Sequence, residues 1–272
     1  MKKRAYAKIN LALNVVGKKD NMHLLDMIMV EVNLFDEIEL TLIPESKIKI
    51  EGMDFVDVEK NLMYKAVKKF EEYTKINVGG VLIKINKKIP HEAGMGGGSS
   101  DAVCVIKILN EQFKAGLSCE DIAKIGISLG SDCPFFAYGG ICRVEGVGEK
   151  VKKLSDKIIS DITIVKPKFG LSTKMIFEEC DKSEFVVKKE LINEIENSVK
   201  GGAVPYRLAF NDLEYVCTKC SEIGLYIESL KEYYEYVFMT GSGSAIICAN
   251  KKNNKNIDQI KKIISDVEIF II

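Results

Sequence analysis

A run of glycines that ends in two serines and an aspartate constrains this chain more than any other feature. It lies in Pro90–Asp101, which reads Pro-His-Glu-Ala-Gly-Met-Gly-Gly-Gly-Ser-Ser-Asp. Glycine accepts positive φ angles and has no Cβ atom, so a glycine-rich backbone can approach a ligand closely. The next residues have the spacing of an amphipathic helix, with apolar side chains at Val103, Ile106, Leu109 and Phe113. A helix that starts behind such a loop offers N–H groups and a positive dipole end to a phosphate.

The elements around the glycine run indicate what kind of loop it is. Val81–Ile89 alternates apolar and polar residues as a strand does, so the loop lies between a strand and a helix. The loop lacks the Gly-Lys-Ser/Thr ending of a Walker sequence and the Gly-x-Gly-x-x-Gly spacing of a dinucleotide fold. A purely structural turn is the alternative, but such a turn needs one or two glycines rather than a run. We therefore predict a nucleotide-phosphate loop and a kinase.

Length and composition limit the class of protein. The 272 residues suffice for two domains, and 47% hydrophobic with 29% charged residues is typical of a globular protein. The 39 basic and 39 acidic residues give a net charge of zero, and no basic stripe with aromatics is present, so nucleic acid is not an expected partner. No window approaches the roughly 18–20 apolar residues of a membrane span, and the N-terminus does not resemble a signal peptide. We expect a cytoplasmic protein with a small-molecule substrate, as a monomer or homodimer.

The eight cysteines indicate neither disulfides nor a metal site. Cys104, Cys142 and Cys248 lie in apolar runs, where a thiol behaves as a small hydrophobe. Cys217 and Cys220 have the spacing of half a zinc site, but no second cysteine pair or histidine pair accompanies them. Residues three apart share a helix face, so this pair is expected to pack together. The sequence predicts reduced, buried thiols.

Periodicity predicts the other elements. Residues 4–16 alternate as a strand with Lys8 and Asn10 on its polar face, and periodicity alone favours a solvated face. A glycine-punctuated hairpin is expected over 137–152. Further strands are predicted at 37–43, 47–51, 161–165, 235–239, 244–249 and 267–272, and helices at 61–75, 118–129, 173–180, 187–199, 211–229 and 255–265. This mixture predicts an α+β protein of two tightly joined lobes, with domains at residues 1–155 and 156–272.

Two more segments carry candidate functional residues. Gly130-Ser-Asp132-Cys-Pro134-Phe-Phe136 places a carboxylate among apolar side chains, where it needs a partner. Lys8, on the polar face of a strand, is a natural counter-ion, and a purely structural ion pair is the alternative for these two residues. Met239-Thr-Gly-Ser-Gly-Ser244 is a second glycine turn, flanked by strands, and a plain hairpin turn explains it equally well.

Taken together, these segments resemble the GHMP kinases over essentially the whole chain. The resemblance implies a ribosomal-S5-like β-α-β domain, a ferredoxin-like C-terminal domain and an active site between the two lobes. Within that group the loop is most similar to that of the kinases that use ATP to phosphorylate the 2-hydroxyl of 4-diphosphocytidyl-2-C-methyl-D-erythritol, in non-mevalonate isoprenoid synthesis. The resemblance rests on Ala7-Lys8-Ile-Asn10-Leu, Pro90-x-x-Ala-Gly-x-Gly-Gly-Gly-Ser-Ser-Asp101, Gly130-x-Asp132-x-Pro134-Phe-Phe, Asn211-Asp-Leu-Glu214 and Met239-Thr-Gly-Ser-Gly-Ser244.

The resemblance also implies roles for individual residues. Asp132 would be the catalytic base, with Lys8 as the charge beside it. ATP would be held by Pro90, Ala93, Gly94, Met95, Gly96, Gly97, Gly98, Ser99 and Ser100. Mg²⁺ should accompany ATP, with the Ser100 hydroxyl near the metal, although helix capping is the alternative role for Ser99 and Ser100. The substrate would contact Asn10, His23, Asp132, Thr173, Phe177, Gly241 and Ser242.

One segment departs from the family pattern. Family members usually carry Asp-Gly-Tyr-His, whose tyrosine stacks on the cytosine, whereas this chain reads Asp20-Asn21-Met22-His23. The methionine sulfur can cover a ring, but losing one aromatic face would cost on the order of 1 kcal/mol. Two alternatives therefore stay open: a GHMP kinase that acts on a different small alcohol, and a catalytically silent small-molecule binder. The intact Lys8, Asp132 and phosphate loop argue against the silent binder.

Overall fold

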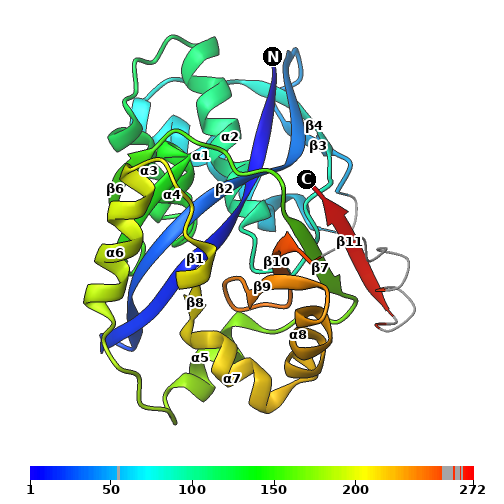
Figure 1. The fold of residues 1–272 in the computed structure, drawn as a ribbon. Helices are drawn as coiled ribbons and strands as arrows, with labels where there is room; N and C mark the ends of the chain where they lie inside the picture. The colour runs from blue at the N-terminus through cyan, green and yellow to red at the C-terminus, as the bar shows by residue number, and fades with distance from the viewer. Residues whose placement is uncertain (54–55, 253–259, 261–263, 265) are drawn as a thin grey trace.

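Two β-sheets organise the part of the chain that the structure describes, which is residues 1–53, 56–252, 260, 264 and 266–272 of a computed structural model (Figure 1). The larger sheet has the order β3-β4-β2-β1-β8, with β5 beside β2 and β6 beside β5, and the smaller sheet has the order β11-β7-β10-β9. The strands are β1 (Lys2–Lys19), β2 (Met22–Ile43), β3 (Ile48–Glu51), β4 (Gly80–Asn86), β5 (Ile141–Gly146), β6 (Lys150–Ser155), β7 (Thr163–Pro167), β8 (Phe210–Asn211), β9 (Tyr234–Met239), β10 (Ile246–Lys251) and β11 (Val267–Ile271). The helices are α1 (Leu62–Thr74), α2 (Gly97–Gln112), α3 (Cys119–Ile127), α4 (Cys133–Tyr138), α5 (Thr173–Cys180), α6 (Lys189–Lys200), α7 (Asp212–Cys220) and α8 (Ile223–Lys231), with short 3₁₀ turns at Val58–Lys60 and Tyr206–Leu208.

A long hairpin of β1 and β2 forms the spine of the larger sheet. The two strands pair antiparallel from Lys2 opposite Glu39 to Lys19 opposite Met22. The turn between them contains Asp20 and Asn21 at φ angles of 48° and 63°, and positive φ at both central residues matches the twist of a tight hairpin. The strand predicted at 4–16 is confirmed and is longer at both ends, while the first half of β2 was not predicted.

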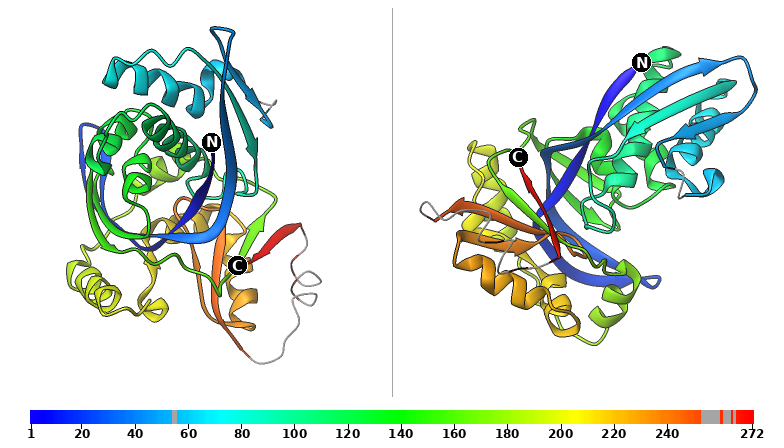
Figure 2. Two further views of the ribbon diagram at one scale, coloured as in Figure 1. Left: turned by 90° about the horizontal axis from the view of Figure 1, so that it is seen from above. Right: turned by 90° about the vertical axis from the view of Figure 1, so that its right-hand side faces the viewer.

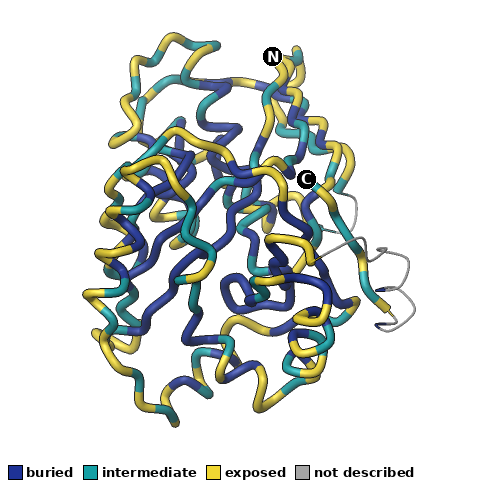
Figure 3. Tube along the Cα trace, viewed as in Figure 1, coloured by how far each residue is buried: buried dark blue, intermediate teal, exposed yellow. Residues whose placement is uncertain are grey.

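The polar face of β1 is buried, contrary to the expected solvated face. Lys8 is 3% exposed, and Asn10 and Asn14 are fully buried. The middle of β1 is accordingly coloured as buried in Figure 3. The second half of the chain covers this face: the Asn10 main-chain N–H donates to Thr240 Oγ1 at 2.9 Å, and the Asn14 amide donates to Asp212 Oδ2 at 2.7 Å. Buried polar groups need such partners, so these contacts attach the second lobe to β1.

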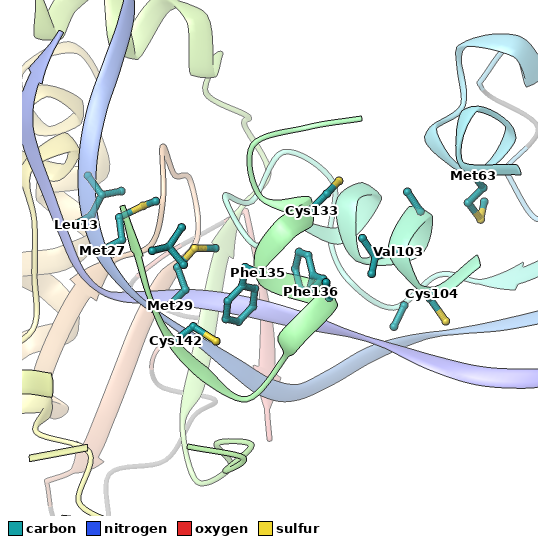
Figure 4. Packing of buried hydrophobic residues seen from close by; sticks show 14 of the residues in the cluster. Leu13, Met27, Met29, Met63, Val103, Cys104, Cys133, Phe135, Phe136 and Cys142 are labelled. Atoms are coloured by element: carbon teal, nitrogen blue, oxygen red, sulfur yellow. The ribbon is translucent and has the colours of Figure 1, made fainter. Parts of the chain in front are cut away.

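Helices α2 and α4 fill the concave side of the larger sheet, which bends around them (Figure 2). Figure 4 shows Phe135 and Phe136 of α4 between the β2 side of this core, marked by Met29, and Val103 of α2. The two phenylalanine rings meet edge to face, with centroids 5.0 Å apart. The Phe136 ring also adjoins the residue that precedes α2, because a Cβ atom added to Gly96 would lie 2.9 Å from it.

The smaller sheet is antiparallel throughout, and α8 packs against its edge strand β9. In chain order its strands are β7, β9, β10 and β11, so the spatial order is fourth, first, third, second, as in ferredoxin-like domains. Strand β8 leaves this part of the chain to pair parallel with β1 of the larger sheet. The predicted α+β fold of two joined lobes is confirmed.

Several predicted elements need correction. The single helix expected over 211–229 is two helices, α7 and α8, because Ser221 adopts extended angles of −152° and 172°. The strand expected at 161–165 runs from Thr163 to Pro167. Most of the helix predicted at 255–265 lies outside the described residues. All eight cysteines are free, but Cys119 and Cys220 are exposed, so the expectation of buried thiols is wrong for these two.

Candidate active site

A cleft of about 890 Å³ lies between the glycine loop and the segments that lead into the smaller sheet. Residues far apart in the sequence meet there, as is common for ligand sites between lobes. The lining includes Lys8 and Asn10 of β1, the loop from Pro90 to Ser99, Asp132 before α4, Thr173 and Phe177 of α5, and Gly241, Ser242 and Gly243 of the second glycine turn.

The glycine loop passes directly into helix α2. Gly94 and Gly96 have φ angles of 69° and 68°, which residues with a Cβ rarely adopt. Gly96 is the N-cap of α2, so Gly97, Gly98 and Ser99 form the first turn and line the cleft. N–H groups in a first turn have no acceptor within the helix, and the helix dipole is positive at this end. The arrangement suits phosphate oxygens.

Gly96 also sits where no side chain fits. A Cβ atom there would lie 2.9 Å from the Phe136 ring and 3.2 Å from Cγ of Lys8. The main-chain N–H of Lys8 donates to the carbonyl of Met95 at 3.0 Å. The loop is therefore fastened to β1 at the point where β1 presents the Lys8 ammonium.

The second glycine turn lies against the phosphate loop. A Cβ atom on Gly94 would lie 2.4 Å from the carbonyl oxygen of Thr240, and one on Gly241 would lie 2.7 Å from the carbonyl oxygen of Gly94. Two main-chain hydrogen bonds of 3.3 Å join the segments, from Ser244 to Glu92 and from Ala245 to Ala93. The turn is thus both the hairpin between β9 and β10 and a wall of the cleft.

Lys8 and Asp132 face each other in this cleft. Lys8 Nζ lies 3.6 Å from Asp132 Oδ2 and donates to Asn10 Oδ1 at 2.7 Å. The Lys8 side chain is 4% exposed, whereas that of Asp132 is 31% exposed. The sequence placed this carboxylate in an apolar, buried setting, and that expectation is wrong because Asp132 opens into the cleft. A held cation beside an accessible carboxylate suits proton transfer from a ligand.

Lys87 lines the cleft as well, although sequence reasoning did not select it. Its ammonium lies 2.5 Å from Asp36 Oδ2 and 2.9 Å from Asp101 Oδ2, and both carboxylates are buried. The other oxygen of Asp36 accepts the main-chain N–H groups of Lys88 and Ile89 at 2.5 and 2.9 Å. The two adjacent lysines directly ahead of the glycine loop were the available signal.

The pKa values of Asp101 and Lys87 are both shifted in this buried cluster. Burial raises the pKa of the Asp101 carboxyl to about 8, and the Asp36 charge adds to the rise while the Lys87 ammonium opposes it. Burial alone would lower the pKa of Lys87, but attraction to Asp101 and Asp36 raises it. Lys87 therefore stays charged at the base of the phosphate loop.

At another part of the cleft, His23 and Phe177 stack on each other. Their ring centroids are 4.9 Å apart with an interplanar angle of 29°. His23 Nε2 lies 3.0 Å from Asp181 Oδ1, which orients the imidazole. Met22, 53% exposed, lines the same cleft.

The structure brings together nearly all the residues that the sequence selected. Ser100 is the exception, because its side chain is buried and its hydroxyl donates to the carbonyl of Tyr6 at 2.7 Å. The expected position of Ser100 beside a metal therefore does not fit, and of the two adjacent serines it is Ser99 that lines the cleft. In the described residues, no group of three or more His, Cys, Asp and Glu side chains is arranged to hold a metal ion.

Comparison with known proteins agrees with this geometry. The family model for the GHMP kinases N terminal domain matches residues 61–140. The 4-diphosphocytidyl-2-C-methyl-D-erythritol kinase of Clostridium acetobutylicum is 38% identical over 252 residues, which cover 90% of this chain and 89% of that protein. The chain belongs to the GHMP kinase family, in the branch of the 4-diphosphocytidyl-2-C-methyl-D-erythritol kinases. The kinase of the same name from Clostridium beijerinckii is 44% identical over 203 residues, covering 72% of this chain and 71% of that protein.

Solved structures of GHMP kinases have the same architecture. A crystal structure of a 4-(cytidine 5'-diphospho)-2C-methyl-D-erythritol kinase aligns with a TM-score of 0.72 and 28% identity, covering 92% of this chain and 90% of that one. The mevalonate kinase of Methanococcus jannaschii aligns with a TM-score of 0.70 but only 18% identity, over 99% and 96% of the two chains, and so shares the fold. As a member of this family, the chain is an ATP-dependent kinase. No helix in the described part of the chain has the length and apolar character to cross a bilayer.

Proposed function

We propose that this kinase transfers the γ-phosphate of ATP to the 2-hydroxyl of 4-diphosphocytidyl-2-C-methyl-D-erythritol in non-mevalonate isoprenoid synthesis. The observation that carries the proposal is the position of Lys8, whose main chain is bonded to the phosphate loop and whose ammonium lies 3.6 Å from Asp132. The phosphate loop, the Lys8 ammonium and the Asp132 carboxylate thus meet at one point. The names of the relatives support the choice of acceptor.

In the proposed reaction the acceptor hydroxyl lies against Asp132. The carboxylate takes the hydroxyl proton as the oxygen bonds to the γ-phosphorus, and the bond from that phosphorus to the bridging oxygen of ADP breaks. Lys8 stabilises the negative charge on the transferred group, with its ammonium held by Asn10. Asp132 is the catalytic base and Lys8 the electrostatic partner in this scheme.

The nucleotide is proposed to bind in the first domain, residues 1–155. Added Cβ atoms on Gly97 and Gly98 would come within 3.1 Å of Ile89 and 3.5 Å of Leu62, so this side of the loop adjoins apolar cleft residues suited to a purine. Mg²⁺ bound with ATP would neutralise phosphate charge. The Ser99 hydroxyl would hold it together with phosphate oxygens, since Ser99 lines the cleft and Mg²⁺ in such sites uses few protein ligands.

The acceptor is proposed to bind between that domain and the second one, residues 156–272. Thr173, Phe177, Gly241 and Ser242 line the cleft from the second domain, and Asn10 and His23 line it from the first. The stacked His23 and Phe177 rings offer aromatic surface and an imidazole to a cytosine. Exposed Met22 gives the base an apolar, polarisable cover in place of a tyrosine ring.

The test is steady-state ADP release with Mg-ATP and the cytidyl substrate, beside the same alcohol without its cytidyl group. Turnover of the cytidyl substrate alone supports the proposal. If the protein binds ATP but does not turn over the cytidyl substrate, it is a GHMP kinase for a different small alcohol, the alternative that Met22 suggests.

Replacement of Met22 tests the cytosine end of the cleft. Met22→Tyr should lower KM for the cytidyl substrate about fivefold, because a second aromatic face contributes on the order of 1 kcal/mol. Met175→Tyr is the matched control, since Met175 is 44% exposed on α5 and is not among the residues that line the cleft. Equal KM values for both variants would remove Met22 from the acceptor site.

A further inference from the structure

The Asn211–Glu214 segment is a motif to which the proposed reaction gives no role. It opens helix α7, and neither Asn211 nor Glu214 is among the residues that line the cleft. Asn211 is 8% exposed, and its amide nitrogen donates to the carbonyls of Met239 at 2.9 Å and Gly241 at 2.8 Å. Its amide oxygen accepts the N–H of Leu213 at 3.0 Å and so caps α7. One side chain therefore joins the start of a helix to the second glycine turn.

Helix α7 holds the same turn through two more side chains. Glu214 Oε2 accepts the main-chain N–H of Met239 at 2.7 Å, and Cys217 Sγ lies 3.8 Å from the carbonyl oxygen of Ser242. Asn211, Glu214 and Cys217 are three residues apart and share one side of the helix start. Three side chains at the start of α7 thus hold the turn, and all of their contacts are with the backbone of the turn.

The other side of the turn touches three parts of the active site. Thr240 Oγ1 accepts the N–H of Asn10 at 2.9 Å, next to Lys8 on β1. The hydroxyls of Ser242 and Thr173 lie 2.8 Å apart, which ties the turn to the helix that carries Phe177. The backbone of the turn packs on that of Gly94 in the phosphate loop. A shift of the turn would move all three parts.

We propose that Asn211 and Glu214 are positioning residues, which set the place of the second glycine turn (Met239–Ser244) and thereby the spacing between the phosphate loop and the acceptor side of the cleft. The predicted effect on kcat rests on the proposed function, because it requires the acceptor. The predicted effect on ADP binding can be measured without any acceptor. Because transfer depends steeply on the placement of the reacting groups, a small displacement of the turn has a large effect on rate.

The first test compares two buried asparagines. Asn14 is fully buried and also makes three side-chain hydrogen bonds, to Val186, Lys188 and Asp212, but none to the turn. Asn211→Ala and Asn14→Ala should therefore lower stability to similar extents. Only Asn211→Ala should also raise the dissociation constant for ADP and lower kcat, each about tenfold or more, because two carbonyls of the turn lose their donor.

Asn211→Asp keeps the inference testable if the alanine variant does not fold. Aspartate caps a helix as well as asparagine does, so α7 keeps its start, but an oxygen replaces the donor that faces the Met239 and Gly241 carbonyls. Its kcat and ADP affinity should fall as in Asn211→Ala. Glu214→Gln retains an acceptor for the Met239 N–H and should keep both values, whereas Glu214→Ala should not.

The positioning role of Asn211 and the proposed substrate can fail independently of each other. If Asn211→Ala and Asn211→Asp match Asn14→Ala in ADP affinity and kcat, the positioning role is overturned, whatever the wild-type substrate is. If the wild-type protein fails to phosphorylate the cytidyl substrate while Asn211→Ala weakens ADP binding, the positioning role stands and the proposed substrate is wrong.

Discussion

Two lysines flank the phosphate loop, and the fold holds them in different ways. Lys87 lies 2.5 and 2.9 Å from two buried carboxylates, whereas Lys8 has one carboxylate at 3.6 Å, on a side chain that is 31% exposed. The loop separates them, because an added Cβ atom on Gly96 would approach Lys8 and one on Gly97 would approach Lys87 Nζ at 3.3 Å. The tight, buried cluster fixes the position of the Lys87 side chain. The Lys8–Asp132 pair is longer and more open, so the Asp132 carboxylate remains available to a substrate.

A structural ion pair is present beside the phosphate loop, but it is Lys87 with Asp36 rather than Lys8 with Asp132. Such a pair was the alternative interpretation of Lys8 and Asp132, yet the buried ion pair that also stabilises backbone is Lys87 with Asp36. Buried charges are expensive unless every partner is in place, so the Lys87 cluster should matter to folding. The Lys8 pair should matter to catalysis. The two sites therefore predict opposite phenotypes for similar substitutions.

Asp132→Asn should have the largest effect on activity. The amide cannot take the hydroxyl proton, and loss of a positioned general base lowers kcat by about 10²–10⁴-fold. ADP affinity and the urea midpoint should stay at wild-type values, because Asp132 is partly exposed and lies outside the phosphate loop. Asp156→Asn, at a side chain 99% exposed, is the control. Full turnover by Asp132→Asn would refute its assignment as the base.

Asp36→Ala should have the largest effect on stability. Removing one partner from a buried charge cluster lowers the free energy of unfolding by about 3–5 kcal/mol. The loss should appear as a lower midpoint in urea denaturation, with Asp156→Ala as the surface control. Asp36→Asn should lose less, since its oxygen can still accept the N–H groups of Lys88 and Ile89. An unchanged urea midpoint for Asp36→Ala would show that the Lys87 cluster does not stabilise the fold, contrary to the contrast drawn with Lys8.

Gly96→Ala tests whether the loop must fit closely around Lys8. The new Cβ would lie 2.9 Å from Phe136 and 3.2 Å from Lys8 Cγ, so one of them must move. Gly116→Ala is matched in backbone strain, with a φ of 69°, but has nothing within 4 Å of the added atom. Both should lose similar stability from backbone strain, and Gly96→Ala should lose more because its Cβ also crowds Phe136. Only Gly96→Ala should lose kcat/KM, on the order of tenfold to hundredfold, because a small misplacement of catalytic groups is costly. Equal kcat/KM in both variants would contradict this.

The parts of the fold that sequence predicted well are local. The strand, loop and helix around Pro90–Asp101 depend on φ preferences of glycine and on helical spacing, and both are properties of neighbouring residues. The first half of β2 escaped prediction because both of its faces are buried, with Met29 in one core cluster and Ile28 and Val30 in the other. A strand buried on both faces shows no alternation.

The errors at the site come from contacts between distant residues. Alternation continues to Ile89, but β4 ends at Asn86 because Asp36 accepts the N–H groups of Lys88 and Ile89. The Lys8 face of β1 looks solvated until the turn at Thr240 covers it. Asp132 looks buried because its neighbours in sequence are apolar, yet a cleft formed by both lobes exposes it. None of these contacts leaves a local pattern.

The smallest predicted effect is a pH dependence of stability that arises at the Lys87 cluster. The pKa of Asp101 is about 8 in the folded protein and 3.8 ordinarily, so between these values the folded chain binds more protons than the unfolded chain. The stabilising contribution is therefore complete below the ordinary pKa and is lost as the pH rises through the folded pKa. Asp101→Asn does not titrate, so its urea midpoint should vary less with pH than that of the wild type between about pH 5 and pH 8. Asp156→Asn should follow the wild type. Parallel profiles for Asp101→Asn and wild type would mean that Asp101 stays ionised beside Lys87.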